Sequence, residues 1–540
     1  MIKKLRIVLA QINPIVGDLN GNLEKHIRAA ITARDELSAD IIVFPELSLT
    51  GYPPEDLLFR HSFIRDTEKT LAKFVNEVKD IYCVVGHPKN YRKKLYNACS
   101  MIFNGNIMGS YAKQRLPNYG VFDECRYFKP GQKPCVVPVH GIPIGLVICE
   151  DVWTPAPIRQ AVAHGARLIL APNASPFEIN KHNARLSVLS KRVAENNVPI
   201  AYINMVCGQD ELVFDGGSMV MNDKGELAQL AGFFNETLHP VNIHISDTTS
   251  EVEINSVPDI SEEEKIYQAL VLGLRDYVNK NNFPSVVLGL SGGIDSALTL
   301  AIAVDALGSD RVKAILLPSR YTSEISIEDA EISAKNLNVE YETISIEPTY
   351  QQFLSSLQPS FNGKKADITE ENIQARCRAI ILMALSNKYS HLVLSTGNRT
   401  ELAVGYCTLY GDMAGGYAVL KDIPKMMVYK LAKYRNQLQA IIPERTIKRA
   451  PTAELAPNQK DQDTLPPYPM LDDILYLYLN EGLSTTDIIA KGFEKNTVER
   501  IVGLIHKNEY KRKQAALGPH INHKSFVKDW RYPVVNGYKK

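Results

Sequence analysis

The sequence lacks the features of secreted, membrane-spanning and polyanion-binding chains. Its basic start has neither the long apolar run nor the small-residue cleavage site of a signal peptide, and no apolar stretch is long enough to cross a bilayer. The chain also lacks an excess of charge of one sign, because its 61 lysines and arginines are balanced by 60 aspartates and glutamates, for a net charge of +1. We therefore expect neither a nucleic-acid partner nor a membrane partner.

Cysteine is present but forms no pattern. The eight cysteines include no C-x-x-C pair, and no nearby histidines complete a zinc pattern. In a chain of this length, scattered cysteines are typical of reduced thiols that mostly fill the core. The expected compartment is therefore the cytoplasm.

Length and patterning predict two domains. A chain of 540 residues is too long for one ordinary hydrophobic core. Strand-like and helical segments alternate through residues 1–245, beginning with the strand-like run 5–12 and the helical spacing of 21–37. This alternation predicts a layered α/β domain. Residues 246–261 are polar, acidic and interrupted by proline, which predicts a linker.

The second half predicts another α/β domain, over residues 262–540. Its first helix has a capping-box start at Ser261–Glu264. A buried strand at 286–290 then leads through a glycine turn into a helix at 296–307. Further strand-like runs follow, so we expect a doubly wound parallel sheet.

Three reactive side chains in the first half follow strand-like runs. Glu46 comes after Ile-Ile-Val-Phe-Pro, Lys113 after Ser-Tyr-Ala, and Cys149 after Ile-Gly-Leu-Val-Ile. Together they suit amide hydrolysis: the thiolate attacks the acyl carbon, the carboxylate carries protons, and the ammonium lowers the thiol pKa and stabilises the oxyanion. Each one alone has an ordinary interpretation, namely a core cysteine, a helix-terminal charge and an exposed lysine.

The neighbouring segments resemble the nitrilase (carbon–nitrogen hydrolase) superfamily. They are Phe44-Pro45-Glu46-Leu47, Leu49-Thr50-Gly51-Tyr52, the six residues from Lys113 to Asn118, and Cys149-Glu150-Asp151. The resemblance covers about residues 5–245 and implies a four-layer αββα sandwich that hydrolyses amides through a thioester. In the glutamine-using branch it implies that Tyr119, Ser175 and Lys181 hold glutamine. Ser175-Pro176 is equally compatible with an ordinary turn.

A glycine-rich loop follows the strand at 286–290. Its sequence is Ser291-Gly292-Gly293-Ile294-Asp295-Ser296. Glycine lets the backbone approach phosphates closely, and the N-terminus of the following helix favours negative charge. The lysine of a Walker A loop is absent. The loop resembles the pyrophosphate-binding loop of ATP pyrophosphatases, which adenylate a substrate oxygen.

Later segments narrow this resemblance to the NAD synthetases, over about residues 262–540. These segments are Pro318–Ser323, Glu371–Arg376, Ser395–Glu401, Gly411–Gly416, Leu420–Asp422, Thr452–Leu455 and Gln459–Tyr468. The family often has serine in place of Thr452 and threonine in place of Met426. The implied fold is an adenine nucleotide alpha hydrolase-like parallel sheet.

The same resemblance implies a set of binding residues. ATP is expected at Gly289, Leu290, Ser291, Gly292, Gly293, Ile294, Asp295, Ser296 and Thr396. Deamido-NAD is expected at Asn372, Glu401, Asp412 and Lys511, and Mg²⁺ at Asp295 and Glu401. Lys421 falls in a segment that closes over the substrate.

The two halves complement each other chemically. An acyl-adenylate needs neutral ammonia, and a fused glutaminase can supply it. We therefore expect glutamine, ATP and deamido-NAD as substrates, and the resemblance implies a homo-oligomer through the synthetase domains. One alternative is a GMP- or asparagine-synthetase-like enzyme, although the latter would have cysteine where this chain has Ile2. There are two further alternatives. One is a non-catalytic sensor, and the other is a simple amidase with a fused binding domain.

Overall fold

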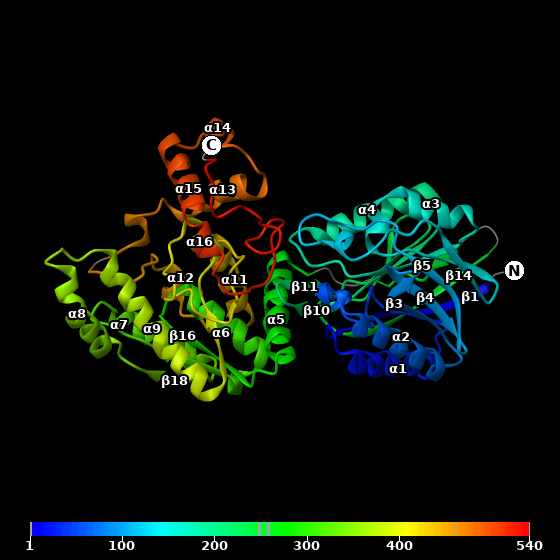
Figure 1. Ribbon diagram of the computed structural model, residues 1–540, viewed down its shortest axis with the longest axis horizontal. Helices are drawn as coiled ribbons and strands as arrows, with labels where there is room; N and C mark the ends of the chain where they lie inside the picture. Colours follow the sequence, from blue (N-terminus) through cyan, green and yellow to red (C-terminus); the bar gives the residue numbers. More distant parts are fainter. Residues whose placement is uncertain (1–2, 247–249, 256–259, 458, 539–540) are drawn as a thin grey trace. The chain divides into compact units, whose positions relative to one another are not determined.

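The computed structural model describes residues 3–246, 250–255, 260–457 and 459–538. Contacts divide the chain into two compact units, Met1–Ile260 and Ser261–Lys540 (Figure 1). Within the expected linker, residues 247–249 and 256–259 lie outside the described residues. Ser250–Val252 is strand β15 and pairs antiparallel with β14 (Thr237–Ile245), so this part of the expected linker belongs to a sheet. The domain boundaries at 245 and 262 stay a prediction.

The first unit contains two large sheets. A seven-stranded sheet has the order β15, β14, β1 (Lys3–Gln11), β2 (Ile41–Val43), β3 (Tyr82–Tyr91), β4 (Lys94–Phe103), β5 (Asn106–Ala112). A six-stranded sheet has the order β13 (Leu227–Leu230), β12 (Met219–Met221), β9 (Ile200–Asn204), β8 (Leu168–Asn173), β7 (Ile142–Leu146), β6 (Cys135–Val139). Strands β10 (Val206–Gln209) and β11 (Leu212–Asp215) form a separate hairpin.

Helices cover the outer faces of these sheets. They are α1 (Leu19–Asp35), α2 (His61–Glu77), α3 (Pro155–Ala163) and α4 (Lys181–Asn196), with the short 3-10 helices η1 (Glu55–Phe59), η2 (Glu124–Arg126) and η3 (Cys149–Trp153). Alanines of α1 and Phe74 of α2 join the apolar side chains of β1, β2 and β3 in one core. Figure 1 shows α1 and α2 on one side of this unit and α3 and α4 on the other. The unit is therefore the expected αββα sandwich.

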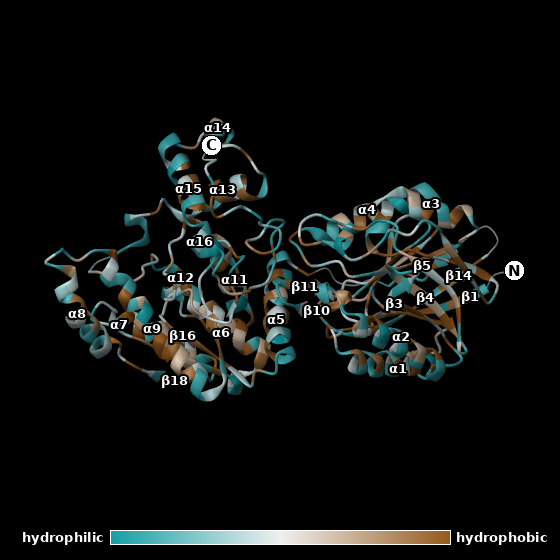
Figure 2. Cartoon of the chain, in the orientation of Figure 1, coloured by the Kyte–Doolittle hydropathy of each residue, from teal (hydrophilic) through white to brown (hydrophobic). Residues whose placement is uncertain are grey.

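Local sequence explains these elements. Helix α1 begins after Asp18, whose carboxylate accepts a hydrogen bond from the amide of Gly21. Apolar residues on the strands are buried on both faces because each sheet lies between a helix layer and the other sheet. Figure 2 shows this as brown runs along the strands, whereas α1 and α2 are mostly teal.

The second unit is built on a five-stranded parallel sheet. Its order is β18 (Glu340–Thr343), β17 (Val312–Leu316), β16 (Ser285–Gly289), β19 (His391–Ser395), β20 (Tyr417–Ala418). From β16 the chain first adds β17 and β18 on one side of the sheet. It then returns to add β19 and β20 on the other side, so the strand order reverses at β16. Ligands of such sheets bind outside the carboxyl ends of the strands at this reversal, which is where the glycine-rich loop lies.

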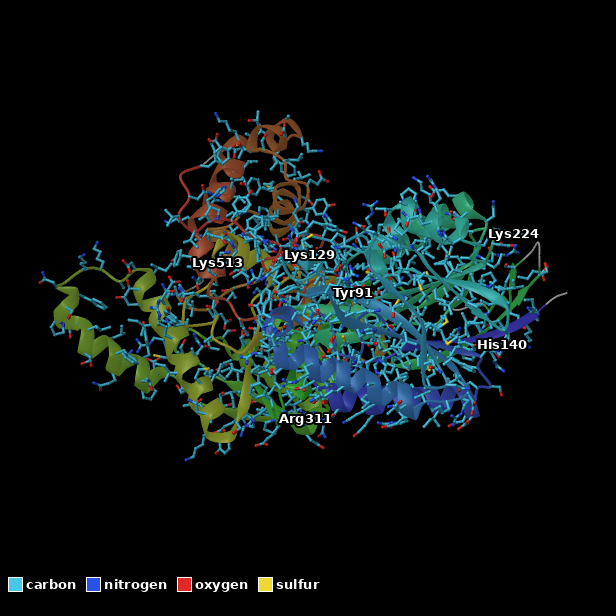
Figure 3. The ribbon with its side chains drawn as sticks, turned by 45° about the vertical axis from the view of Figure 1, so that its right-hand side comes forward. Tyr91, Lys129, His140, Lys224, Arg311 and Lys513 are labelled. Atoms are coloured by element: carbon cyan, nitrogen blue, oxygen red, sulfur yellow. The ribbon has the colours of Figure 1, made fainter. Side chains whose placement is uncertain are left out.

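The remaining elements of the second unit are mostly helical. They are α5 (Glu262–Lys280), α6 (Ile294–Leu307), η4 (Ser309–Arg311), α7 (Glu324–Asn336), α8 (Glu347–Phe361), α9 (Ile368–Tyr389), α10 (Arg399–Val404), α11 (Lys425–Leu438), α12 (Glu444–Lys448), η5 (Asp461–Asp463), α13 (Tyr468–Leu475), the π-helical turn η6 (Tyr476–Asn480), α14 (Thr485–Ala490), α15 (Lys495–Lys507) and α16 (Glu509–Arg512). Helix α5 has the expected cap, since Ser261 accepts from the amide of Glu264. Arg311, labelled in Figure 3, ties η4 to the chain before β16 by donating to the carbonyls of Phe283 and Pro284.

Candidate active sites

Glu46 is fixed from several directions in the first unit. It follows β2 in a tight turn and is fully buried. Its Oε2 accepts from the amide of Ala174 (3.0 Å), and its Oε1 accepts from Asn97 Nδ2 (2.6 Å) and Lys113 Nζ (2.7 Å). Strand β3 passes so close that a Cβ at Gly86 would lie 2.4 Å from the amide nitrogen of Leu47. The carboxylate therefore has little freedom to move.

Lys113 follows β5 and binds a second carboxylate, Glu124, which sequence reasoning missed. Lys113 Nζ lies 2.8 Å from Glu124 Oε1, and Tyr52 donates to the same oxygen at 3.0 Å. Burial opposes the charge of Lys113, but Glu124 and Glu46 raise its pKa well above the usual value. Burial and Glu46 together raise the pKa of Glu124 to about 7, against the opposing effect of Lys113.

No local pattern singles out Glu124. It lies in η2 within a loop, eleven residues after Lys113, so no strand leads directly into it. The loop is tied to β4 where the amide of Lys129 (labelled in Figure 3) donates to the carbonyl of Leu95 at 2.8 Å. Only the folded chain brings this carboxylate beside the lysine.

Cys149 begins η3, just past β7, and is 5% exposed. Its φ of 44° is in the left-handed region, a strained conformation for a cysteine. Burial and the charge of Glu46 raise its pKa well above the usual value, and the opposing effect of Lys113 is smaller. The ammonium lowers the thiol pKa as expected, but burial and Glu46 outweigh its effect. The raised pKa favours the neutral thiol over the thiolate at neutral pH.

The three residues expected to hold glutamine all border this region. Tyr119 is 56% exposed and donates to Glu150 Oε2 at 2.9 Å, next to Cys149. Ser175 follows Ala174 and accepts from Arg185 Nε at its Oγ (3.2 Å). Lys181 Nζ is 3.0 Å from Glu178 Oε2 and 5.3 Å from the centroid of the Trp153 ring, at the end of η3. Their binding role stays a prediction.

The glycine-rich loop of the second unit joins β16 to α6. A Cβ at Gly292, where φ is 77°, would lie 2.1 Å from the carbonyl oxygen of Ser326, so only glycine fits. Ser291 and Ser296 hold the loop together, with their hydroxyl oxygens 3.0 Å apart. Gly293 is the N-cap of α6. The N-terminus of this helix faces the cavity beside the loop.

A buried lysine lies between the two carboxylates expected to bind metal. Lys425 Nζ is 2.5 Å from Asp295 Oδ2 and 3.2 Å from Glu401 Oε1, and its side chain is 2% exposed. Asn398 Nδ2 also donates to Asp295, at 2.9 Å. Burial disfavours the charge of Lys425, but both carboxylates raise its pKa above the usual value. Burial raises the pKa of Glu401 to about 7, against the effect of Lys425. Sequence reasoning assigned Lys425 no role.

Lys425→Met is expected to destabilise the second unit. Removing one partner of a buried ion pair leaves uncompensated charge and typically costs about 3–5 kcal/mol. Thermal unfolding followed by circular dichroism would show a lower midpoint for the second unit's transition. Lys430→Met, on the exposed face of the same helix, is the control. Equal midpoints for the two variants would contradict a structural role for the lysine.

A cavity of about 310 Å³ adjoins this cluster. Its lining includes most of the expected ATP and metal residues, namely Gly289, Leu290, Ser291, Gly293, Ile294, Asp295, Ser296, Thr396 and Glu401, together with Asp412. Arg378 and Arg449 also line it and bring positive charge. The composition of this wall suits a phosphorylated ligand.

Asn372 and Lys511 do not line this cavity but brace one of its walls. Asn372 Oδ1 accepts from Thr408 Oγ1 at 2.7 Å, and the amide of Thr408 donates to Asp412 Oδ1 at 2.5 Å. Lys511 Nζ donates to the carbonyls of Gly405 (2.8 Å) and Cys407 (2.7 Å). Lys421 Nζ likewise donates to the carbonyl of Ala516, at 2.7 Å.

The part of the chain that the structure describes contains neither a cluster of metal-ligating side chains nor a membrane-spanning helix. No group of three or more histidine, cysteine, aspartate or glutamate side chains there is arranged to hold a metal ion. A magnesium ion at Asp295 and Glu401 would therefore need further ligands, such as phosphate oxygens and water. No helix in the described ranges combines the length and apolarity needed to cross a membrane.

Two protein families match the chain, one in each unit. The carbon–nitrogen hydrolase family matches residues 6–250, and the NAD synthase family matches residues 266–515. The structure of a glutamine-dependent NAD(+) synthetase from Cytophaga hutchinsonii, at 22% identity, has the same fold, with a TM-score of 0.85 over 99% of this chain and 98% of its own.

Relatives of higher identity match over the full length. The glutamine-dependent NAD(+) synthetase of Acinetobacter baylyi is 47% identical over 541 residues, covering 100% of this chain and 99% of its own. That of Thermotoga maritima is 45% identical over 575 residues, covering both chains fully. The structure of the Acinetobacter baumannii enzyme in complex with ADP is 45% identical, with a TM-score of 0.81 over 99% of both chains. The chain therefore belongs to the glutamine-dependent NAD(+) synthetase family of enzymes.

Proposed function

We propose that this enzyme converts deamido-NAD to NAD with ATP and with ammonia taken from glutamine. The observation that carries the proposal is the pairing of two chemically distinct sites in one chain. One has a buried carboxylate and ammonium acting on a buried thiol. The other has a glycine-rich loop beside a cavity that holds two carboxylates and a lysine.

In the first site, Cys149 attacks the side-chain amide carbon of glutamine. Glu46 takes the thiol proton and passes it to the departing ammonia, and Lys113 stabilises the oxyanion. The product is a glutamyl thioester, which water hydrolyses to glutamate with Glu46 again as the base. The raised thiol pKa supports this order, because deprotonation has to accompany attack.

In the second site, the cavity holds ATP with its phosphates against residues 289–296, Thr396 and Lys425. The nicotinate carboxylate of deamido-NAD attacks the α-phosphorus and releases pyrophosphate. Ammonia then attacks the acyl-adenylate and releases AMP. We place deamido-NAD near Asn372, Glu401, Asp412 and Lys511, which lie in or behind one wall. The ADP bound by the A. baumannii relative supports a nucleotide here.

Mg²⁺ is part of this proposal. The carboxylates of Asp295 and Glu401 are hard oxygen ligands on the cavity wall, and an ion held there would take its remaining ligands from phosphate oxygens and water. When bound, the ion neutralises charge on the phosphates. Lys425 keeps the two carboxylates together, because its Nζ lies 2.5 Å from Asp295 Oδ2 and 3.2 Å from Glu401 Oε1.

The remaining expectations concern location and assembly. We propose a cytoplasmic enzyme, supported by eight cysteines that form no disulfide, all within the described residues. We also propose a homo-oligomer through the second unit. Helix α9 supports this, because it exposes apolar side chains at Ile368 (68%), Ile380 (54%) and Met383 (40%).

The decisive experiment gives the purified enzyme deamido-NAD, ATP and Mg²⁺, with glutamine in one tube and ammonium in another. NAD and AMP are followed in both. We expect NAD from either nitrogen source with one AMP per NAD. Chelation of Mg²⁺ should stop AMP release in both tubes and leave glutamine hydrolysis detectable.

Each departure from this result is informative. NAD from ammonium alone would remove the glutaminase assignment of the Glu46–Lys113–Cys149 site. NAD from neither source would show that deamido-NAD is the wrong acceptor. AMP release that survives chelation would remove the magnesium assignment.

A further inference from the structure

We propose that Asp151 is a positioning residue that keeps the lysine and the cysteine of the glutaminase site in fixed relation. The inference rests on the proposed glutaminase function and deepens it. Asp151 touches neither reacting group through its side-chain hydrogen bonds. It instead binds the backbone directly beside each of them.

Four donors converge on this fully buried carboxylate. Its Oδ1 accepts from the amides of Gln114 (3.1 Å) and Arg115 (2.8 Å), and its Oδ2 accepts from the amide of Ile148 (3.1 Å) and the hydroxyl of Tyr111 (2.9 Å). Each oxygen therefore accepts two hydrogen bonds, which fills its usual acceptor directions. Few single side chains could replace this arrangement.

The donors come from both sheets of the sandwich. Tyr111 belongs to β5 of the seven-stranded sheet, and Gln114 and Arg115 directly follow Lys113. Ile148 directly precedes Cys149, past the end of β7 of the six-stranded sheet. The lysine and the cysteine thus follow strands of separate sheets, and the Asp151 carboxylate joins the two segments.

This junction has a chemical purpose. The ammonium has to lie within hydrogen-bond reach of the oxyanion that forms when the thiol attacks, and a displacement of about 1 Å can cost roughly 100-fold in rate. A carboxylate suits four donors because its ionised form only accepts. Burial raises the pKa of Asp151 to about 6, which still leaves it ionised at neutral pH. Lys113, Tyr111 and Cys99 are the titratable groups that face it.

A purely structural role is the competing explanation. Asp151 caps η3 through Ile148, so a variant could simply weaken the first unit. The two roles differ in what they change. Loss of fold lowers the fraction of folded protein, whereas loss of alignment lowers the kcat of the folded protein for glutamine, with KM nearly unchanged.

The test compares Asp151→Asn with the wild type. The asparagine amide turns one acceptor oxygen into a donor that faces two other donors. We expect kcat for glutamine hydrolysis to fall by about 100-fold, with KM changed by no more than about threefold. NAD formation from ammonium should remain at the wild-type rate. A KM effect without a kcat effect, or equal losses with both nitrogen sources, would overturn the proposal.

Tyr111→Phe covers the case in which Asp151→Asn does not fold. It removes one of the four donors, so kcat for glutamine should fall by about fivefold, the equivalent of one hydrogen bond. Tyr82→Phe is the matched control, because that ring stacks on Phe103 in the same sheet. Equal kcat values for the two variants would refute the positioning role. A wild-type enzyme that makes NAD from ammonium but hydrolyses no glutamine would instead refute the glutaminase function on which this role depends.

Discussion

Cys149→Ala is expected to lose glutamine-driven NAD formation by roughly 10⁴-fold or more while keeping ammonium-driven formation at the wild-type rate. The side chain supplies the attacking sulfur, and neither Glu46 nor Lys113 can replace it as an acyl acceptor. Because Cys149 belongs to one compact unit and the glycine-rich loop to the other, the substitution should leave the nucleotide site intact. Both rates come from one assay of NAD with saturating glutamine or ammonium.

Cys83→Ala is the matched control for this experiment. It removes another fully buried thiol from the same unit, in β3. We expect it to keep both activities, with at most a small loss of stability from the cavity. Loss of ammonium-driven synthesis in a folded Cys149→Ala protein would argue against two separate sites.

Asp295→Ala is expected to lower NAD formation from both nitrogen sources by roughly 10³-fold. The carboxylate belongs to the glycine-rich loop, lies on the wall of the proposed nucleotide cavity, and binds Lys425 and Asn398. Its removal takes away a ligand for the proposed magnesium ion and releases the lysine. Glutamine hydrolysis measured alone should persist, which makes this variant the converse of Cys149→Ala.

The controls separate charge from shape. Asp295→Asn keeps the size of the side chain and should be nearly as impaired, because the amide cannot replace the negative charge. Asp310→Ala removes an exposed carboxylate in η4 and should have no effect. Wild-type synthesis by Asp295→Ala would exclude Asp295 from the active site.

Much of this architecture could be predicted from strand endings. Apolar runs near residues 5–12, 41–44 and 286–290 correspond to β1, β2 and β16, and reactive residues follow several of them. Glu46 and Lys113 were predicted to belong to one site, and their side chains lie 2.7 Å apart. An apolar run that ends at a polar residue is a local feature of the sequence, so it can be recognised without knowing the fold.

Glu124, Lys425 and Asp151 show where such reasoning fails. Lys425 meets Asp295 across 130 residues and Asp151 meets Gln114 across 37, whereas Glu124 reaches Lys113 through the course of an irregular loop. No nearby spacing encodes these contacts, since they depend on how the sheets and loops are placed. The net direction of the thiol pKa shift could not be predicted either, because burial is a property of the whole fold.

Gly86 carries no functional group, yet the chemistry of the first site depends on it. Its backbone presses against the turn that holds Glu46, where a Cβ would come within 2.5 Å of the carbonyl oxygen of Pro45. One added methyl group here would displace Glu46, the proposed proton carrier, without touching the substrate. Some positions that carry no catalytic side chain are therefore among the least tolerant of mutation in this enzyme.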